Sequence, residues 1–374
     1  MPIFICNDPI KRQNPWATEK CKSLIEECQK RRIRYDEISS PTELREKLAL
    51  TKGEFSSIVL FPMNESDRHY LFSRYGDIDI HKIVFAHHNI NIFSADFSSV
   101  INDFNGDMKL AMSHLLDRGC KRIALLHAHP NSYHDGMRIE TYTQFVPHPP
   151  LLFNASGDKL YPTMEDLMRC HEKIDAVICI NDYIAFCFML FLDKMVENWQ
   201  KKLAVLSFSD TILSGLHAPS LTSLSFNYTE AGKEIVSIHR TMEKKDRLAY
   251  MHFIMKPSLA ARQTTQTENP AGVVFADLPR ISREEFQSII APQAKCMPLE
   301  KMLAGCDRVD FEIIYGLLLA HPLSKIQSDV FLSQSAVKHR IRKYRDVLKF
   351  DRVNDLAAWL RLWIDPQKLK EKIR

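Results

Sequence analysis

The chain has 374 residues, of which 45% are hydrophobic and 26% charged. This composition is typical of a globular protein with two or three domains. No apolar run reaches the ~18 residues of a membrane-spanning helix, and the opening MPIFICNDP lacks a basic segment followed by a long apolar one. We therefore expect no signal peptide and no membrane partner. Nine scattered cysteines without a C-x-x-C pair predict a reduced, cytoplasmic protein.

Up to about residue 263, short β-like runs alternate with helical patterns. The expected strands are IFIC, SSIVLF, KIVFA, RIALLHA, DAVICI and LAVLSF. The expected helices include ATEKCKSLIEECQKR, GDMKLAMSHLLDRG, DYIAFCFMLFLDKM and TEAGKEIVSIHRTMEK. Apolar strands separated by helices predict an α/β fold with doubly wound sheets. A stretch of this length is large for one such sheet, so two lobes are expected.

Five stretches of this region are informative together: NPWATEKCKSLIEECQKRRIRY, INDFNGDMKLAMSHLLDRGCKRIALL, DAVICINDYIA, LAVLSFSDTILSGLHAPSLTSL and KPSLAARQTT. In this order they resemble the LacI/GalR regulators. The resemblance implies a two-lobed, periplasmic-binding-protein-like (type 1) sensor over residues 1–263. Lobe 1 would hold about 1–100 and 226–247, and lobe 2 about 101–225 and 248–263. The chain would cross between the lobes near Ile101, Ser225 and Leu248. A sugar or related metabolite would bind in the cleft, at the carboxyl ends of the strands.

The resemblance also implies ligand-binding residues, namely Asn7, Asp8, Trp16, Arg138, Asn181, Ser209 and Asp210. Asn181 matches the family's cleft asparagine, whose amide both donates and accepts; the alternative is a helix cap. Trp16 is alternatively a core or interface residue, and Arg138 a surface salt-bridge residue. Ser209 stands where the family has an aspartate. Either Asp210 supplies the carboxylate, or the ligand is unusual, or ligand binding is reduced.

Residues 264–303 are turn-rich and predict a linker with some structure of its own. From residue 304 to the end there are 14 Lys and Arg against 9 Asp and Glu, a net charge of +5. The whole chain carries 50 against 46, so the remainder carries 36 against 37, or −1. The positive charge is therefore a property of the carboxyl-terminal domain and indicates a polyanionic partner.

Residues 307–361 read DRVDFEIIYGLLLAHPLSKIQSDVFLSQSAVKHRIRKYRDVLKFDRVNDLAAWLR. With Glu312, Ile326, Val330, Leu332, Ser333, Val337, Lys338 and Leu348 in place, this stretch resembles the LuxR-type helix-turn-helix. The resemblance implies helices at about 309–320, 325–331, 334–348 and 353–363. In the third helix, Val337, Ile341, Tyr344 and Leu348 recur on one face, while basic residues occupy the other. An apolar side toward the domain and a basic side toward phosphate are what a DNA recognition helix needs. The expected DNA-binding residues are Ser333, Gln334, Ser335, Val337, Lys338, His339, Arg340, Arg342 and Lys343. Phe331 replaces the glycine of the family's turn.

Together these patterns predict a homodimeric transcriptional regulator that binds double-stranded DNA and a sugar-like effector. The alternative is a sensor or scaffold with a degenerate cleft, whose basic tail binds a protein. No phosphate loop, G-x-S-x-G or H-E-x-x-H motif is present, so we expect no enzyme activity and no cofactor. The histidines at 127, 129 and 134, with those at 87 and 88, lack clear zinc spacing, so no metal is expected.

Overall fold

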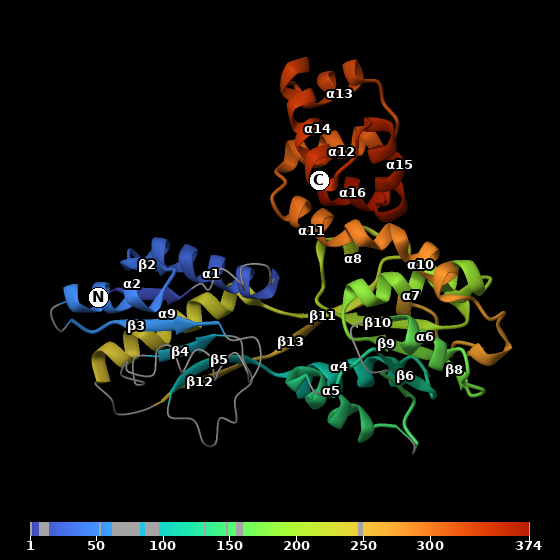
Figure 1. Cartoon of the computed structure of the whole chain (residues 1–374), viewed down its shortest axis with the longest axis horizontal. Helices are drawn as coiled ribbons and strands as arrows, with labels where there is room; N and C mark the ends of the chain where they lie inside the picture. The colour runs from blue at the N-terminus through green and yellow to red at the C-terminus, as the bar shows by residue number, and fades with distance from the viewer. Residues whose placement is uncertain are drawn as a thin grey trace. The chain divides into compact units, whose positions relative to one another are not determined.

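The computed structural model describes residues 2–6, 15–51, 54–61, 83–86, 97–130, 132–146, 149–154, 160–245 and 250–373. They form two compact units (Figure 1). The first unit comprises Met1–Met108, Pro130–Arg138 and Phe226–Ser258, and the second comprises Lys109–His129, Ile139–Ser225 and Leu259–Arg374. Among these residues, no helix has both the length and the hydropathy to cross a membrane.

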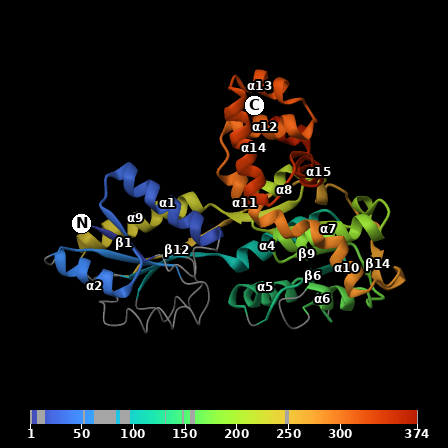
Figure 2. The same cartoon turned by 45° about the horizontal axis from the view of Figure 1, so that its top comes forward.

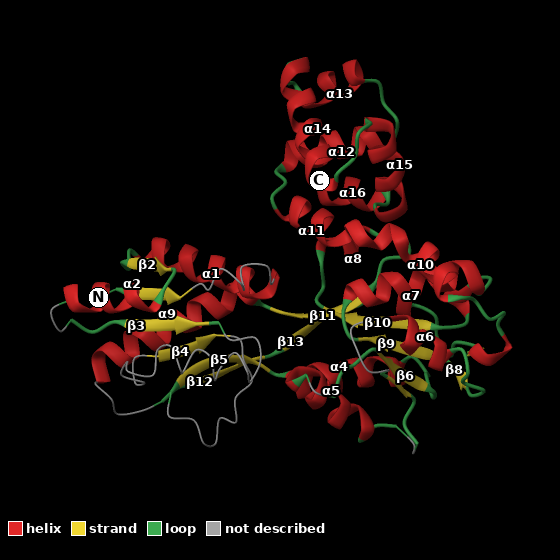
Figure 3. Cartoon of the chain, in the orientation of Figure 1, coloured by secondary structure: helices red, strands yellow, loops and turns green. Residues whose placement is uncertain are grey.

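The first unit contains a six-stranded sheet in the order β12-β5-β4-β3-β1-β2, in which every neighbouring pair is parallel. Its strands are β1 (Ile3–Cys6), β2 (Tyr35–Ile38), β3 (Ser57–Leu60), β4 (Ile83–Ala86), β5 (Ser98–Asn102) and β12 (His252–Met255). Its helices include α1 (Pro15–Arg31), α2 (Pro41–Leu50) and α9 (Tyr228–Lys245). The sheet and its helices form alternating layers (Figure 3).

Both faces of this sheet are covered, because successive strand residues point to opposite sides. Ile3 and Ile5 of β1 belong to the hydrophobic cluster that α1 and α9 complete. Phe4, between them, belongs to a second cluster with Leu44 of α2. Burial on both faces explains why these strands appear in the sequence as continuous apolar runs.

The second unit contains another six-stranded sheet, in the order β13-β11-β10-β9-β6-β7. Its strands are β6 (Ile123–Leu126), β7 (Leu152–Phe153), β9 (Ala176–Cys179), β10 (Ala204–Phe208), β11 (Thr222–Phe226) and β13 (Pro257–Ala260). A small antiparallel pair joins β8 (Lys173–Ile174) to β14 (Val273–Val274). The flanking helices are α4 (Phe104–Asp117), α5 (Tyr133–Thr143), α6 (Leu160–Leu167), α7 (Asp182–Met195) and α8 (Ile212–Leu216).

The chain passes from one sheet to the other three times. The first two crossings follow β5 and β11, close to the expected positions at Ile101 and Ser225. The third lies later than the expected Leu248, because β12 pairs with β5 in the first sheet and only β13 joins the second. Residues 252–255 therefore belong to the first unit.

The region predicted as a linker is folded and packs on the second sheet unit. It contains α10 (Arg283–Ile290), the 3-10 helix η6 (Ala291–Lys295) and α11 (Cys296–Ala304). Figure 2 shows α10 beside α7. Phe286 of α10 and Leu299 of α11 are buried in the same hydrophobic cluster as the α7 aromatics. This segment therefore forms a packed layer between the sheet and the carboxyl-terminal helices.

The carboxyl-terminal domain is all-helical. Its helices are α12 (Arg308–Leu318), α13 (Leu323–Val330), α14 (Gln334–Leu348), α15 (Val353–Trp363) and α16 (Pro366–Ile373). The bounds of α14 and α15 agree with the expected helices, whereas α16 was not expected. Within α15 and its end, Leu360, Trp363 and Ile364 are buried, so they pack in the core. Leu362 is 55% exposed.

Candidate functional site

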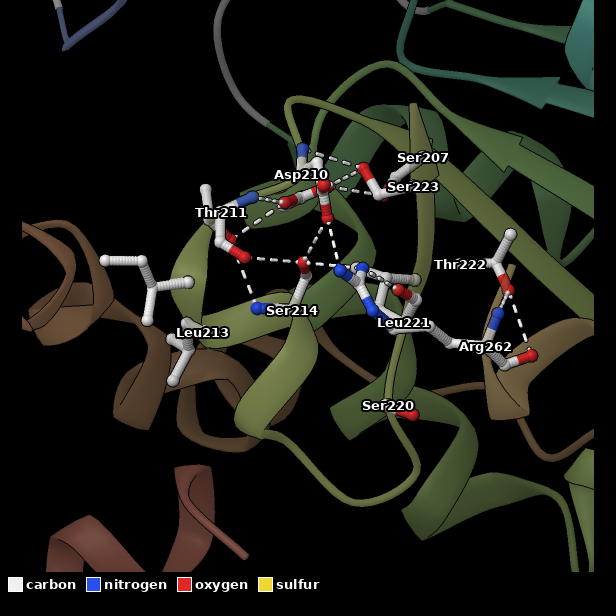
Figure 4. A network of polar contacts seen from close by, with 12 residues as sticks. Ser207, Asp210, Thr211, Leu213, Ser214, Ser220, Leu221, Thr222, Ser223 and Arg262 are labelled. Atoms are coloured by element: carbon white, nitrogen blue, oxygen red, sulfur yellow. Dashed lines mark hydrogen bonds and ion pairs between the residues drawn. The ribbon is translucent and has the colours of Figure 1, made fainter. Parts of the chain in front are cut away.

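The loop after β10 carries the acidic group that the resemblance assigned to a ligand. Ser209 has φ 134° and Asp210 has φ 48°, both in the left-handed region that L residues rarely adopt. The backbone N–H of Asp210 donates to Ser223 Oγ at 3.0 Å. Its carboxylate pairs with Arg262 at 2.6 Å and accepts from Ser214 Oγ at 3.3 Å (Figure 4). Strained backbone of this kind persists where the surroundings fix it, and such positions concentrate at functional sites.

The fully buried carboxylate of Asp182 accepts hydrogen bonds from this loop and from the strands next to it. It accepts from the hydroxyls of Ser207 at 2.5 Å and Ser223 at 2.6 Å. It also accepts from both the backbone N–H of Thr211 at 2.7 Å and the Thr211 hydroxyl at 2.8 Å. Burial raises the pKa of Asp182, and these four donors act against that rise. The sequence shows Asp182 only as the residue after Asn181, so its role was missed.

Arg262 connects three segments of the second unit. Its Nη1 donates to Ser214 Oγ at 3.1 Å and to the carbonyl of Leu221 at 2.9 Å. Its Nη2 pairs with Asp210. A planar guanidinium donates in several fixed directions at once, so Arg262 fixes the Asp210 loop, α8 and the start of β11 relative to one another.

Helix α8 follows this loop, and carboxyl-terminal segments form hydrogen bonds with both of its ends. At its start, Glu300 of α11 accepts from the backbone N–H groups of Ile212 at 2.7 Å and Leu213 at 3.0 Å. At its end, the N–H of Asp365 donates to the carbonyl of Leu216 at 2.8 Å. Glu300 supplies acceptors for amides that the first turn leaves unpaired, so α8 is joined both to α11 and to the residue before α16.

Aromatic rings complete this contact. The Trp363 ring lies 5.7 Å from His217 and 5.5 Å from Phe186 of α7, centroid to centroid. Burial lowers the pKa of His217, which favours its neutral form. The carboxyl-terminal helices and the second sheet thus share one hydrophobic cluster.

The predicted ligand residues fall in different parts of the chain. Asn181 caps α7, accepting from the N–H of Ile184 at 3.0 Å. The cap uses Oδ1 and leaves the amide NH2 outside it. Asn181, Ser209 and Asp210 belong to the second unit, and Arg138 to the first. Residues 7 and 8 lie outside the described part of the chain, as does the side chain of Trp16 in α1.

Arg138 forms a buried ion pair. Its Nη2 is 2.5 Å from Asp107 Oδ2, and its guanidinium lies 5.1 Å from the centre of the Phe104 ring. Burial raises the pKa of Asp107 to about 6, and the charge of Arg138 opposes that rise. Arg138 is therefore a buried rather than a surface salt-bridge residue.

Lys20 is a second buried cation of the first unit, and no sequence pattern predicted its burial. Its ammonium is fully buried, donates to Asn102 Oδ1 at 3.1 Å and lies 5.6 Å from the centre of the Tyr228 ring. Burial lowers its pKa to about 7. Among the residues that the structure describes, the polar partner of this ammonium is the neutral amide of Asn102, whereas buried charges normally have an ionic partner.

The recognition helix predicted from the sequence is α14. Ser333 caps it, accepting from the N–H of Ala336 at 3.2 Å. Seven of the predicted DNA-binding residues are exposed, namely Ser333, Gln334, Ser335, Lys338, His339, Arg342 and Lys343. Val337 is fully buried in the core, so its prediction as a contact residue is corrected to a packing role. Arg340 is partly buried and pairs with Asp307 at 2.9 Å and Asp310 at 2.6 Å.

A groove of about 820 Å³ runs beside α14. Its lining includes the apolar residues Leu317, Ile326 and Ile341 and four basic residues, Lys338, Arg342, Arg345 and Arg361. No acidic residue lines it. The arrangement places a positive edge beside the exposed side of the helix.

Comparisons with known proteins bear on the α/β region. A family model described as a periplasmic binding protein-like domain matches residues 112–265. A search of curated proteins gave no match. Three similar solved structures are the lac repressor dimer bound to operator and the anti-inducer ONPF, a complex of the transcriptional regulator CelR with cellobiose, and an uncharacterized protein from Actinobacillus succinogenes.

These three structures are 15%, 13% and 19% identical to the chain, with TM-scores of 0.54, 0.53 and 0.53. The matches cover 71%, 70% and 70% of this chain and 81%, 84% and 98% of the other chains. At such identities they show the fold. The chain therefore has a type 1 periplasmic-binding-protein-like α/β region followed by a helical carboxyl-terminal region, as predicted.

Proposed function

We propose that the chain is a ligand-responsive transcriptional regulator that binds duplex DNA through α14. The observation that carries the proposal is the build of this helix. Val337, Ile341, Tyr344 and Leu348 are buried against the rest of the domain. On the outside, Lys338, His339, Arg342 and Lys343 are exposed. A cationic exposed face on a rigidly packed helix suits the phosphates and base edges of a major groove.

The turn before α14 supports the LuxR-type assignment. Phe331 takes the left-handed conformation, φ 54° and ψ 37°, that a glycine supplies in that family's turn. The sequence left the turn in question because Phe331 lacks the conformational freedom of glycine. Its side chain is 93% exposed, so the backbone forms the turn without burying the ring.

The sensor part of the proposal rests on the fold and on the polar loop at Asp210. Structures of this fold include a lac repressor with an anti-inducer and a CelR–cellobiose complex. By analogy we assign this chain a sugar-like effector, with Asn181 and Asp210 among its partners. The Asn181 NH2 and the Asp210 carboxylate offer the donor and the acceptor that hydroxyls require.

Attachment of the carboxyl-terminal helices to the second unit supplies the link between sensing and DNA binding. Glu300 and Trp363 join them to α8 and α7. Reorientation of this unit would therefore carry α14 with it. In a homodimer reading two half-sites, such reorientation changes the spacing of two recognition helices, which changes DNA affinity.

The test is DNA binding by the full chain as a function of salt, with a duplex of random sequence. The double variant Lys338→Ala/Arg342→Ala should bind more weakly, and its log–log salt slope should fall by about 2, since each lost phosphate contact removes about 0.9. The matched control, Lys301→Ala/Lys370→Ala, removes two exposed charges from α11 and α16 and should keep the wild-type slope.

Absence of binding even at low salt would refute the DNA assignment and favour a protein partner for the basic domain. An unchanged slope in the Lys338/Arg342 variant, with binding retained, would move the DNA-contacting surface away from α14.

A further inference from the structure

A second cavity lies within the second unit, where the Asp210 loop and α8 face α16. Its volume is about 610 Å³, within the usual range for small-molecule sites. One wall comes from the α/β region and includes Asp210, Ser220 and Arg262. The other comes from α16 and includes Lys368 and Lys372. Nothing in the sequence pattern indicated that these segments meet.

The α/β wall is rich in hydroxyl and amide groups. Thr211, Ser220, Gln263 and Gln266 line it. Side chains of this type donate to and accept from ligand hydroxyls in a fixed geometry. Ser220 is already positioned, because its N–H donates to Gln263 Oε1 at 2.9 Å and its Oγ to the same atom at 3.3 Å. Such a wall suits a polyhydroxylated molecule.

The charges on the two walls favour an anion. Asp210 and Arg262 neutralise one another at 2.6 Å. The helix wall contributes two ammonium groups one turn apart, Lys368 and Lys372, against the single carboxylate of Glu371. The net charge of the lining is therefore +1, and the surplus lies on α16.

Within the part of the chain that the structure describes, neither ammonium forms an ion pair with a carboxylate. Lys368 Nζ contacts the neutral hydroxyl of Ser220 at 3.2 Å. Lys372 Nζ lies 5.6 Å from the centre of the Phe311 ring. A carboxylate or phosphate within reach of both amines would form charge-assisted hydrogen bonds, which are about twice as strong as neutral ones.

Both walls are held in place by other contacts. Glu300 fixes the start of α8, and the Asp365–Leu216 hydrogen bond joins the end of α8 to the start of α16. Arg262 positions the Asp210 loop, because it pairs with Asp210 and donates hydrogen bonds to Ser214 and Leu221. A preformed wall binds with a smaller ordering cost than a mobile one.

From these observations we infer that the cavity between α8 and α16 binds a polyhydroxylated anion of monosaccharide size. Its anionic group meets Lys368 and Lys372, and its hydroxyls meet the wall at Thr211, Ser220 and Gln263. A ligand that spans the two walls strengthens the attachment of the carboxyl-terminal helices to the sensor. Ligand binding in this cavity does not depend on the proposed function. The effect of that binding on DNA affinity does rest on the proposed function.

Calorimetric titration of the purified full chain tests the site. The probes are D-glucose, D-gluconate, D-glucose 6-phosphate and inorganic phosphate. At least one of the two sugar anions should bind more tightly than glucose and inorganic phosphate, since only the sugar anions offer both groups. Preference for gluconate identifies a carboxylate site, and preference for glucose 6-phosphate a phosphate site.

The variants locate the binding. Lys368→Gln/Lys372→Gln should lower the affinity for the tighter-binding sugar anion at least tenfold, which corresponds to about 1.4 kcal/mol of binding free energy. Lys370→Gln removes an exposed lysine of the same helix that does not line the cavity, and should change the affinity less than twofold. Melting temperatures without ligand check that all variants fold.

Two results would overturn the inference: neither sugar anion binds, or the tighter one binds the double lysine variant as well as wild type. In the second case, loss of binding in Asn181→Ala would place the ligand elsewhere, so the proposed sensor would survive without this cavity. Loss of DNA binding alone would leave the cavity assignment intact and refute only the proposed function.

Discussion

Asp210 and Arg262 form an ion pair of 2.6 Å between the loop after β10 and the residues after β13. About a quarter of each side chain is exposed to solvent. The carboxylate that the sequence offered as a substitute for the family's ligand aspartate therefore already has a cationic partner. An effector hydroxyl that binds the Asp210 carboxylate would either share it with Arg262 or displace Arg262 from it. Effector binding would therefore change the ion pair directly.

We predict that this pair stabilises the fold more than a surface pair does. A double-mutant cycle with Asp210→Asn and Arg262→Gln should give a coupling free energy of about 1 kcal/mol in urea unfolding. The matched pair is Arg308–Glu312 on α12, in which Arg308 is 73% exposed. Its cycle should give about 0.3 kcal/mol. Equal coupling energies in the two cycles would mean that Arg262 acts through its other contacts.

Glu300 gives the second prediction, because its carboxylate accepts from two backbone amides at the start of α8. Glu300→Ala should lower the free energy of unfolding by about 2 kcal/mol, the usual cost of stranding buried donors. Hydrogen exchange should speed up at Ile212 and Leu213. Lys301→Ala, an exposed neighbour on α11, is the control and should leave both quantities unchanged.

The same experiment separates a local cap from a connection between domains. If Glu300 only caps α8, faster exchange stays within residues 211–216. If it attaches the carboxyl-terminal helices to the α/β region, exchange also rises in α16, whose start bonds to the end of α8 through Asp365 and Leu216. We expect the wider response.

Local sequence patterns predicted the elements well, because their causes are local. The apolar runs became strands buried on both faces. The bounds of α14 followed from its apolar spacing and the Ser333 cap. The helix ends at Leu348, and the cap residue Lys349 that follows takes a left-handed conformation. In each case the residues that decide the structure lie within a few positions of one another.

Contacts between distant segments were not predictable in the same way. Glu300 lies 88 residues from Ile212 along the chain, and no spacing rule joins an acidic residue to a remote helix start. Residues 264–303 contain many turn-forming residues. Two of their apolar side chains, Phe286 and Leu299, are nevertheless buried in the common core. Turn-forming residues occur in packed segments as well as in loose linkers, so local composition does not separate the two.

The turn residue Phe331 gives the third prediction. An L side chain in the left-handed region costs roughly 1–2 kcal/mol, which glycine avoids. Glycine, however, increases the conformational entropy of the unfolded chain, which lowers the free energy of unfolding by about 1 kcal/mol. Phe331→Gly should therefore raise the free energy of unfolding by about 0.5 kcal/mol. Phe331→Ala removes the exposed ring but keeps the strain, so it should be no more stable than wild type.

These two variants also assign a role to the exposed ring. Equal losses of DNA affinity in Phe331→Gly and Phe331→Ala would mean that the ring contacts DNA. Unchanged affinity in both would mean that Phe331 serves only the turn. A destabilised Phe331→Gly in urea unfolding would contradict the strain argument.

Lys20 gives the last prediction, and its sign depends on pH. Burial lowers its pKa from 10.5 to about 7, so folding disfavours the ammonium. A depressed folded-state pKa means that stability is greatest above the unfolded value and is lost as the pH falls toward 7. Lys20→Met keeps the apolar stem and removes the charge. It should therefore stabilise the protein at pH 7, by an amount on the order of 3 kcal/mol.

The gain should shrink as the pH rises toward the unfolded pKa of 10.5, because removing the proton that the folded state disfavours then costs less free energy. Urea unfolding at pH 7 and pH 9.5 measures this difference. Lys22→Met, an exposed neighbour on α1, should show little change at either pH. If Lys20→Met is instead destabilised at pH 7, the interactions with Asn102 and the Tyr228 ring must outweigh the burial of the ammonium, and Lys20 would be a structural cation of the first unit.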